Sequence, residues 1–180
     1  FRSVTTTQMN ALVNGIAYSD TASILSNGTR TITITSLQDD GGTANGGVDT
    51  ATLSIASTIT IDTTAPVAPA ITAYNDNVGT VTGDQASGTR TDDTTPTFKG
   101  TAEANSTVSL YNGATLLGTT TAGASGNWTF TPATALAEGS YSITAKATDA
   151  AGNTGAASSA FALTVDNTAP VAPAITAYND

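Results

Sequence analysis

The sequence predicts an all-β protein that is built as an extended array of tandem β-sandwich domains. Three observations support this prediction. Thr accounts for 38 of the 180 residues, and Thr fits the half-buried surface of a strand. Stretches of alternating apolar and polar residues are short, and 17 Gly separate them at close intervals. A block of sequence also returns after about 100 residues.

The repeated block sets the domain boundaries. Residues 61–76 return as residues 165–180 at an offset of 104, with 14 of the 16 positions identical. A repeat of about 100 residues is too long for a solenoid unit and fits one β-sandwich domain. We therefore expect the C-terminal part of a β domain at 1–62, a complete sandwich at 63–166, and a linker with the first strand of the next repeat at 167–180. We also expect the chain to be part of a longer tandem array.

Each copy of the block carries two closely spaced prolines. They are Pro66 and Pro69 in the first copy, and Pro170 and Pro173 in the second. Paired prolines extend and stiffen the backbone, and neither linker contains Gly. The sequence therefore predicts semi-rigid joints between domains.

Seven strands are predicted within the complete domain, from alternation with a period of two residues. They lie at 71–74, 97–102, 108–111, 116–121, 127–131, 141–148 and 160–165. Asn112 and Gly113 form a hairpin signal between two of them. Seven strands in roughly 100 residues are typical of an immunoglobulin-like sandwich.

Three aromatic residues have specific predicted positions in this domain. Trp128 and Phe130 share the inward side of their strand, so we expect them in the core. The alternative for Trp128 is a sugar-stacking platform. Tyr141 opens a strand just after Gly139 and fits the pattern of a tyrosine corner.

The first 62 residues resemble the back half of a similar domain in their pattern. Strands are expected at 31–35, with Ile32 and Ile34 inward, and at 52–61, with a Gly-rich loop at 39–49 between them. Residues 8–18 could hold a short helical turn that runs into a strand at Tyr18. Without front strands, this half is expected to expose a sheet edge.

Charge and composition exclude several classes of function. The formal charge is −9, from 14 acidic and 5 basic residues, and the chain has neither Cys nor His. Disulfide scaffolds, thiol and imidazole metal sites, and Ser-His or Cys-His catalysis are excluded. An acidic chain does not offer the cationic surface that nucleic acids require. No apolar run approaches the roughly 20 residues that span a bilayer.

The acidic residues are strongly biased toward Asp, which supplies 12 of the 14. Asp is favoured in turns, and it is also a preferred oxygen ligand for hard cations. Composition alone does not separate these two explanations.

The strand map gathers these acids at the two poles of the sandwich. The chain is expected to enter at one pole and to leave at the other. Four acids fall at the exit pole, namely Asp76, Asp92, Asp93 and Asp166, while Asp62 and Asp149 fall at the entry pole. Clustered carboxylates repel one another without a counter-ion, and Ca²⁺ takes 6–8 oxygen ligands. Asn153, Asn167 and Glu103 could add ligands; the alternative is that these Asp residues only cap turns.

Several motifs then resemble a known family. They lie in order at 75–79, 91–97, 100–103, 126–128, 147–154 and 165–170. Together they are similar to the bacterial Ig-like repeats of giant secreted adhesins, the biofilm-associated and repeats-in-toxin adhesins of Gram-negative bacteria. Residues 10–18 and 41–49 are similar to cadherin-like repeats of the same giant proteins.

The resemblance implies a secreted, cell-surface stalk segment whose joints are stiffened by Ca²⁺. Its partners would be neighbouring repeats, other adhesin chains, or surface ligands reached through distal domains. The alternative function is a module that binds glycan or another surface ligand directly, for example through Thr119, Thr120 and Thr121. Catalysis is not expected. Without His or Cys, a Ser-Lys pair would have to use Lys99 or Lys146, and both are predicted to be solvated, so no nucleophile–base set can be assembled.

Overall fold

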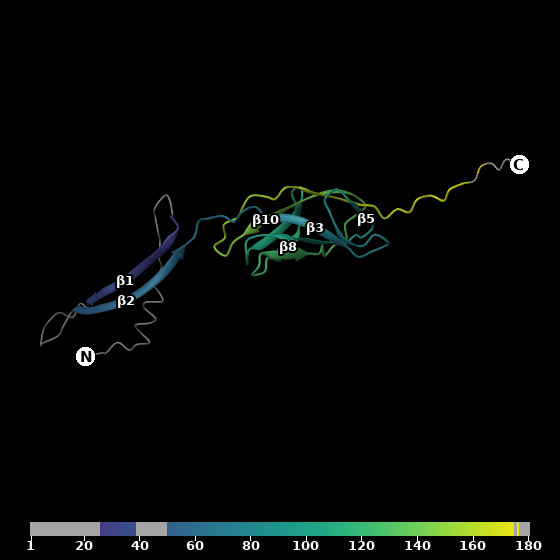
Figure 1. Ribbon diagram of the computed structural model, residues 1–180. Helices are drawn as coiled ribbons and strands as arrows, with labels where there is room; N and C mark the ends of the chain where they lie inside the picture. The colour runs from purple at the N-terminus through teal and green to yellow at the C-terminus, as the bar shows by residue number, and fades with distance from the viewer. Residues whose placement is uncertain (1–25, 39–49, 175, 177–180) are drawn as a thin grey trace. The chain divides into compact units, whose positions relative to one another are not determined.

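The computed structural model describes residues 26–38, 50–174 and 176, and every regular element among them is a β-strand (Figure 1). The chain divides into two compact units, Phe1–Thr63 and Thr64–Asp180. The strands confirm the predicted all-β class. In the described parts of the chain, no helix has the length and apolarity that crossing a membrane requires.

The first unit contains an antiparallel ribbon of β1 (Gly28–Gln38) and β2 (Thr50–Ile61). Ile32 and Ile34 are half-buried, whereas the neighbouring Thr31 and Thr33 are exposed, as the alternation predicts. Ile34 lies opposite Ile55, and the register shifts just beyond this pair. The Gly-rich loop at 39–49 and the segment at 8–18 lie outside the described residues.

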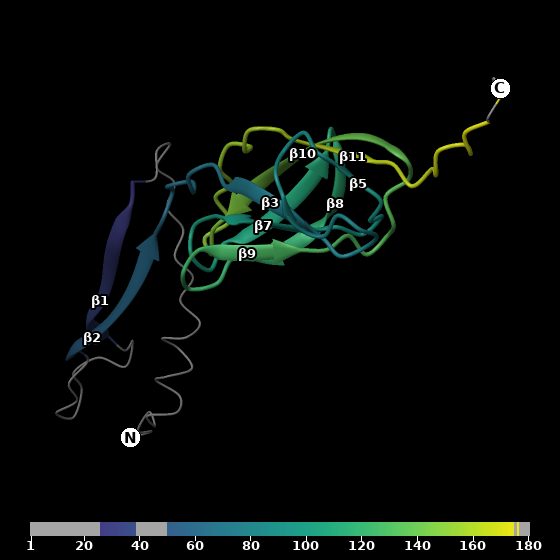
Figure 2. The same ribbon diagram turned by 45° about the vertical axis from the view of Figure 1, so that its right-hand side comes forward.

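The second unit is an immunoglobulin-like sandwich of two sheets (Figure 2). One sheet has the order β5-β11-β10-β7-β8 and the other the order β4-β3-β6-β9. The strands are β3 (Ala70–Asp76), β4 (Gly83–Gln85), β5 (Arg90–Thr91), β6 (Thr97–Thr101), β7 (Thr107–Asn112), β8 (Thr115–Thr121), β9 (Asn127–Phe130), β10 (Gly139–Thr148) and β11 (Phe161–Val165).

All seven predicted strands of this domain are present, and two short strands are added. The additions are β4, with three residues, and β5, with two. Neither is long enough to show an alternating pattern. β5 pairs in parallel with β11, so that Thr91 lies opposite Val165. This pairing brings the end of β5 to the end of the last strand.

The core lies between the two sheets and centres on three aromatic rings. Tyr74, Phe98 and Phe161 have ring centroids 6.2 to 6.5 Å apart, and two of the three pairs meet edge to face. Such contacts add about 0.5–1.5 kcal/mol per pair beyond the burial of area. Trp128 and Phe130 are also buried, as predicted.

Two predicted local motifs are present. Asn112 pairs with Thr115 across the two-residue turn that joins β7 to β8, and Gly113 there has a φ of 59°. The Tyr141 hydroxyl donates a 2.7 Å hydrogen bond to the carbonyl of Ala137, which is the contact of a tyrosine corner.

The Pro-containing linker packs on the second unit as part of it. Pro66 and Pro69 are buried, and Gly155 lies so close to Pro66 that an added Cβ would overlap its carbonyl. Gly155 follows β10, at the pole away from the end of β11. The chain therefore enters this domain at one pole and leaves at the other, as Figure 1 shows.

Candidate cation site at the exit pole

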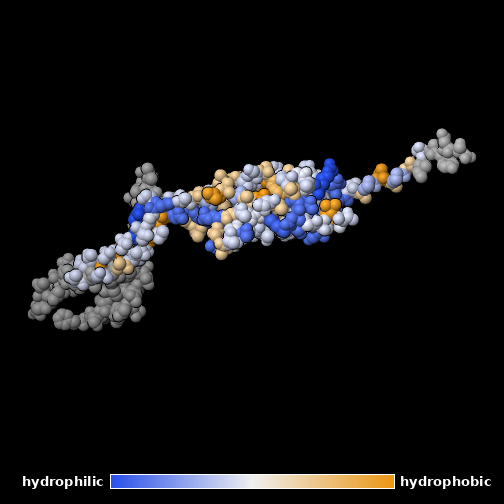
Figure 3. All heavy atoms as spheres, in the orientation of Figure 1, coloured by the Kyte–Doolittle hydropathy of each residue, from blue (hydrophilic) through white to orange (hydrophobic). Residues whose placement is uncertain are grey.

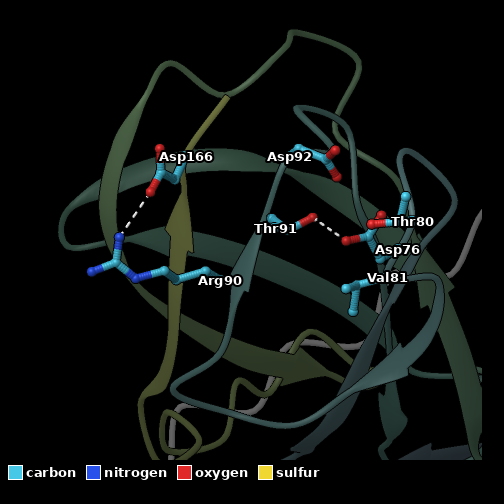
Figure 4. Close-up of a pocket in the computed structure, with 7 residues that line it drawn as sticks. All are labelled: Asp76, Thr80, Val81, Arg90, Thr91, Asp92 and Asp166. Atoms are coloured by element: carbon cyan, nitrogen blue, oxygen red, sulfur yellow. Dashed lines mark hydrogen bonds and ion pairs between the residues drawn. The ribbon is translucent and has the colours of Figure 1, made fainter. Parts of the chain in front are cut away.

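The exit pole collects the ends of three strands. Asp76 ends β3, Asp92 follows β5 directly, and Asp166 follows β11. The backbone N–H of Asp166 donates to the carbonyl of Thr91, which continues the parallel pairing past the strand ends. A pocket of about 170 Å³ lies here (Figure 4). Its lining consists of Asp76, Thr80, Val81, Arg90, Thr91, Asp92 and Asp166.

Asp76 is the buried acid of this pocket, with 2% of its surface exposed. One carboxylate oxygen accepts a 3.0 Å hydrogen bond from the backbone of Val78, and the other accepts a 2.6 Å bond from the Thr91 hydroxyl. Both donors are neutral. They satisfy hydrogen bonding but do not balance the negative charge.

Asp93 lies next to this network and is 1% exposed. Its backbone N–H donates to the same Thr91 hydroxyl at 3.0 Å, and its Oδ1 accepts from the backbone of Thr95 at 2.7 Å. Its Oδ2 is buried and has no hydrogen-bond partner. A buried carboxylate oxygen without a partner is costly, so this atom fits a bound cation or water.

The negative charges at this pole affect the pKa of the Tyr74 hydroxyl. It contacts the Thr89 hydroxyl at 2.9 Å and donates to the carbonyl of Arg90 at 3.1 Å. Burial raises the pKa of Tyr74. The charges of Asp76 and Asp93 raise this pKa further, whereas hydrogen bonds with Thr89 and Thr91 lower it. The two buried carboxylates therefore act on the same part of the core.

Asp92 reaches over the pocket because Gly79 leaves room for it. The turn after β3 places Gly79 at a φ of 69°, in the left-handed region that favours glycine. A Cβ at this position would lie 2.9 Å from Cγ of Asp92 and closer still to its Oδ2. The glycine thus allows an exposed carboxylate to rest against the turn.

Asp166 is held by the basic residue of the pocket. Its Oδ2 lies 2.8 Å from Nη1 of Arg90, and the two side chains are 36% and 74% exposed. Figure 4 shows Asp166 directed toward Arg90, away from Asp92 and Asp76. In the described part of the chain, no three carboxylates lie close enough together to ligate one ion.

The donor set nevertheless fits a hard cation in its chemistry. Three carboxylates line one pocket together with Thr80 and Thr91, and carboxylates are oxygen ligands of the kind that Ca²⁺ prefers. The nearby Oδ2 of Asp93 adds a buried acceptor without a partner. What separates the set is the direction of Asp166. Figure 3 shows strongly hydrophilic surface at this end of the domain.

The predicted ligands of the entry pole are arranged differently. Oδ1 of Asp149 accepts hydrogen bonds from the backbones of Ala151 and Asn153, at 2.9 and 2.8 Å. Its Oδ2 accepts a 2.8 Å bond from the Asn153 side chain. These bonds, that of the Asn153 amide most, lower the pKa of Asp149. The Asp149 carboxylate therefore caps the turn that follows β10.

The remaining predicted ligands are not gathered into this site. Asp62 belongs to the first unit and is exposed. Asn167 is exposed in the segment after β11, and Glu103 is exposed between β6 and β7. The candidate site is therefore the pocket at the exit pole.

Sequence reasoning missed Arg90 and Thr91. Arg90 is one of only five basic residues, and it stands two positions before the pair Asp92 and Asp93. A single basic residue next to two acids in an acidic chain could have indicated that Arg90 pairs with an acid at this pole. The role of Thr91 has no such signal, because it depends on Asp76, 15 residues earlier.

The two-sheet fold defines an immunoglobulin-type β-sandwich module. The profile of the bacterial Ig-like domain matches residues 67–167, which is more than half of the chain. The chain therefore belongs to the family of bacterial Ig-like domains. A search of curated protein sequences finds no match.

Among solved structures, the chain is similar to one described as the BSP domain of a biofilm-associated protein. The two share 25% sequence identity with a TM-score of 0.39. The match covers 81% of this chain but 20% of that chain, so the sequence spans about a fifth of its length.

Proposed function

We propose that the chain is an extender segment in the stalk of a large bacterial cell-surface adhesin. Its domains are arranged in series, and Ca²⁺ bound at the joints stiffens the array. Three features support this proposal: membership of the bacterial Ig-like family, the repeated block at 61–76 and 165–180, and entry and exit of the chain at opposite poles. All three features point to a structural role.

The observation that carries the calcium proposal is the pocket lined by Asp76, Asp92 and Asp166, at the pole where the Pro-containing segment leaves the domain. The buried Asp93 follows Asp92 in the chain, and its Oδ2 has no hydrogen-bond partner. Asp76 and Asp93 are buried with neutral hydrogen-bond donors, so a cation near them would supply the missing positive charge. Ca²⁺ suits an all-oxygen set of this kind.

At this pole the chain's own residues would restrain the departing segment. Asp166 follows the last strand and begins that segment, whereas Asp76 and Asp92 belong to the body of the domain. An ion shared among these carboxylates would tie the segment to the β3 and β5 ends and reduce its bending. It would also stabilise the domain, because the folded state binds the ion and the unfolded chain does not.

The test is thermal unfolding of the 180-residue chain in Ca²⁺, Mg²⁺ and EDTA, followed by the fluorescence of Trp128. At a Ca²⁺ concentration of about 100 Kd, binding adds about 2.7 kcal/mol, and about 4–8 °C per kcal/mol is expected for a domain of this size. The Tm should therefore rise by about 10 °C or more. Asp92→Asn and Asp166→Asn should reduce the shift, while Glu103→Gln, a change to an exposed acid elsewhere, should preserve it.

Small-angle scattering then tests stiffening itself. We expect a larger maximum dimension and less flexibility in Ca²⁺ than in EDTA. Identical melting and scattering in the two conditions would mean that the Asp residues only cap turns, and would refute the calcium part of the proposal.

A further inference from the structure

The exit pole already contains a cation, the guanidinium of Arg90. It lies on β5, one residue before the buried Thr91, and its side chain lines the same pocket as the three carboxylates. Its partner Asp166 is the acid that turns away from the other two (Figure 4). The positive charge at the exit pole is therefore paired with the acid that is directed away from the other two.

We propose that Arg90 is an internal counter-ion that competes with the divalent cation for Asp166 and so lowers the cation affinity of the exit pole. This inference rests on the proposed calcium function. A bound ion would draw Asp166 from Arg90 toward Asp76 and Asp92, and without the ion Asp166 would pair with Arg90 again.

The geometry of the ion pair suits this exchange. One contact of 2.8 Å joins Nη1 to Oδ2, and the Arg90 side chain is 74% exposed. Exposed ion pairs of this kind are weak, because water competes for both groups. The pair therefore holds Asp166 in a defined direction without locking it there. By contrast, the buried Asp76 stays in place through the Thr91 hydroxyl.

Arg90 also acts on the ion after the exchange. β5 fixes its backbone beside the pocket, so the guanidinium remains near the bound cation and repels it. A unit charge about 7 Å from a divalent ion, in a medium as polar as water, changes the affinity roughly five- to tenfold. Added salt screens this repulsion over about 8–10 Å, so the effect should shrink as ionic strength rises.

The experiment is calorimetric titration of the 180-residue chain with Ca²⁺ at low and high salt. Arg90→Gln should bind Ca²⁺ roughly five- to tenfold more tightly than the wild type at low salt, with the same stoichiometry. Arg90→Lys keeps the charge and should remain close to wild type. Lys146→Gln is the charge-matched control, because Lys146 lies on β10 over the ring of Tyr111, and it should change the affinity less than about twofold.

A second measurement does not depend on a variant folding correctly. In the wild-type chain, the side-chain NMR signals of Arg90 should move toward those of a free guanidinium as Ca²⁺ is added. Arg90 signals that stay unchanged, or an Arg90→Gln affinity equal to or below that of the wild type, would overturn the inference while leaving the calcium function intact. An absence of Ca²⁺ binding in every form would overturn both.

Discussion

Replacing Gly100 by Ala should strongly destabilise the sandwich. Gly100 lies on β6 opposite Ile71 of β3 and beneath the ring of Trp128. An added Cβ would lie 2.6 Å from Cε2 of Trp128, and closer still to its Cζ2 and to the carbonyl oxygen of Ala70. Carbon atoms in favourable contact are about 3.5–4.0 Å apart, so the added Cβ would overlap the ring by about 1 Å or more.

The expected cost follows from what would have to move. Overpacking a filled core typically costs about 1–3 kcal/mol. At Gly100 the methyl group meets the backbone of β3 and a buried indole ring together, so we expect a value near 3 kcal/mol, at the upper end of that range. At about 4–8 °C per kcal/mol, the Tm should fall by well over 10 °C.

Urea unfolding followed by Trp128 fluorescence measures this cost, because Trp128 is the sole Trp of the sequence and lies in the second unit. Gly123→Ala is the matched control. Its Cβ would find an ordinary contact, 3.6 Å from the carbonyl oxygen of Asn127, and its stability should change by less than about 0.5 kcal/mol. A Gly100→Ala midpoint equal to that of the control would refute the packing described for β3, β6 and Trp128.

Three further changes test other contacts. Tyr141→Phe removes the corner hydrogen bond and should cost about 0.5–1.5 kcal/mol in urea unfolding. Asn153→Ala should raise the pKa of Asp149 toward its ordinary value of 3.8, as measured by an NMR titration. Because the folded state lowers the pKa of Asp149, its hydrogen bonds stabilise the wild-type protein above pH 3.8, and this stability is lost as the pH falls through the folded pKa. Gly155→Ala should push the carbonyl of Pro66 away and lower stability by about 1–3 kcal/mol, and a stable variant with unchanged proteolysis of the linker would contradict the packing.

The sequence was sufficient to predict the long strands, because alternation is a local signal that burial enforces. Phe98 and Gly100 on β6, like Ile143 and Ala145 on β10, are inward at every second position and are buried. The tyrosine corner was also predictable, because the hydroxyl of Tyr141 bonds within its own turn. β4 and β5 were not, because strands of two or three residues form only where longer neighbours offer a free edge.

The candidate site was predictable in outline but not in detail. Topology alone places Asp76, Asp92 and Asp166 at one pole, and the structure places all three around one pocket. The pairing of Arg90 with Asp166 joins residues 76 positions apart through a parallel ladder, which no local pattern reveals. The burial of Asp93 depends on tertiary packing, and its sequence context resembles an ordinary turn.

The entry and exit of the chain at opposite poles determine how the domain would respond to tension. A pull on the chain acts on the start of β3 and on the end of β11, in opposite directions along the strand axes. Hydrogen bonds between antiparallel strands lie across those axes, so the load is spread over a whole ladder at once. Rupture then requires shearing many bonds together, whereas a domain entered and left at one pole could be unzipped one bond at a time. Before β3 is loaded, the packing of Pro66 against Gly155 would have to yield.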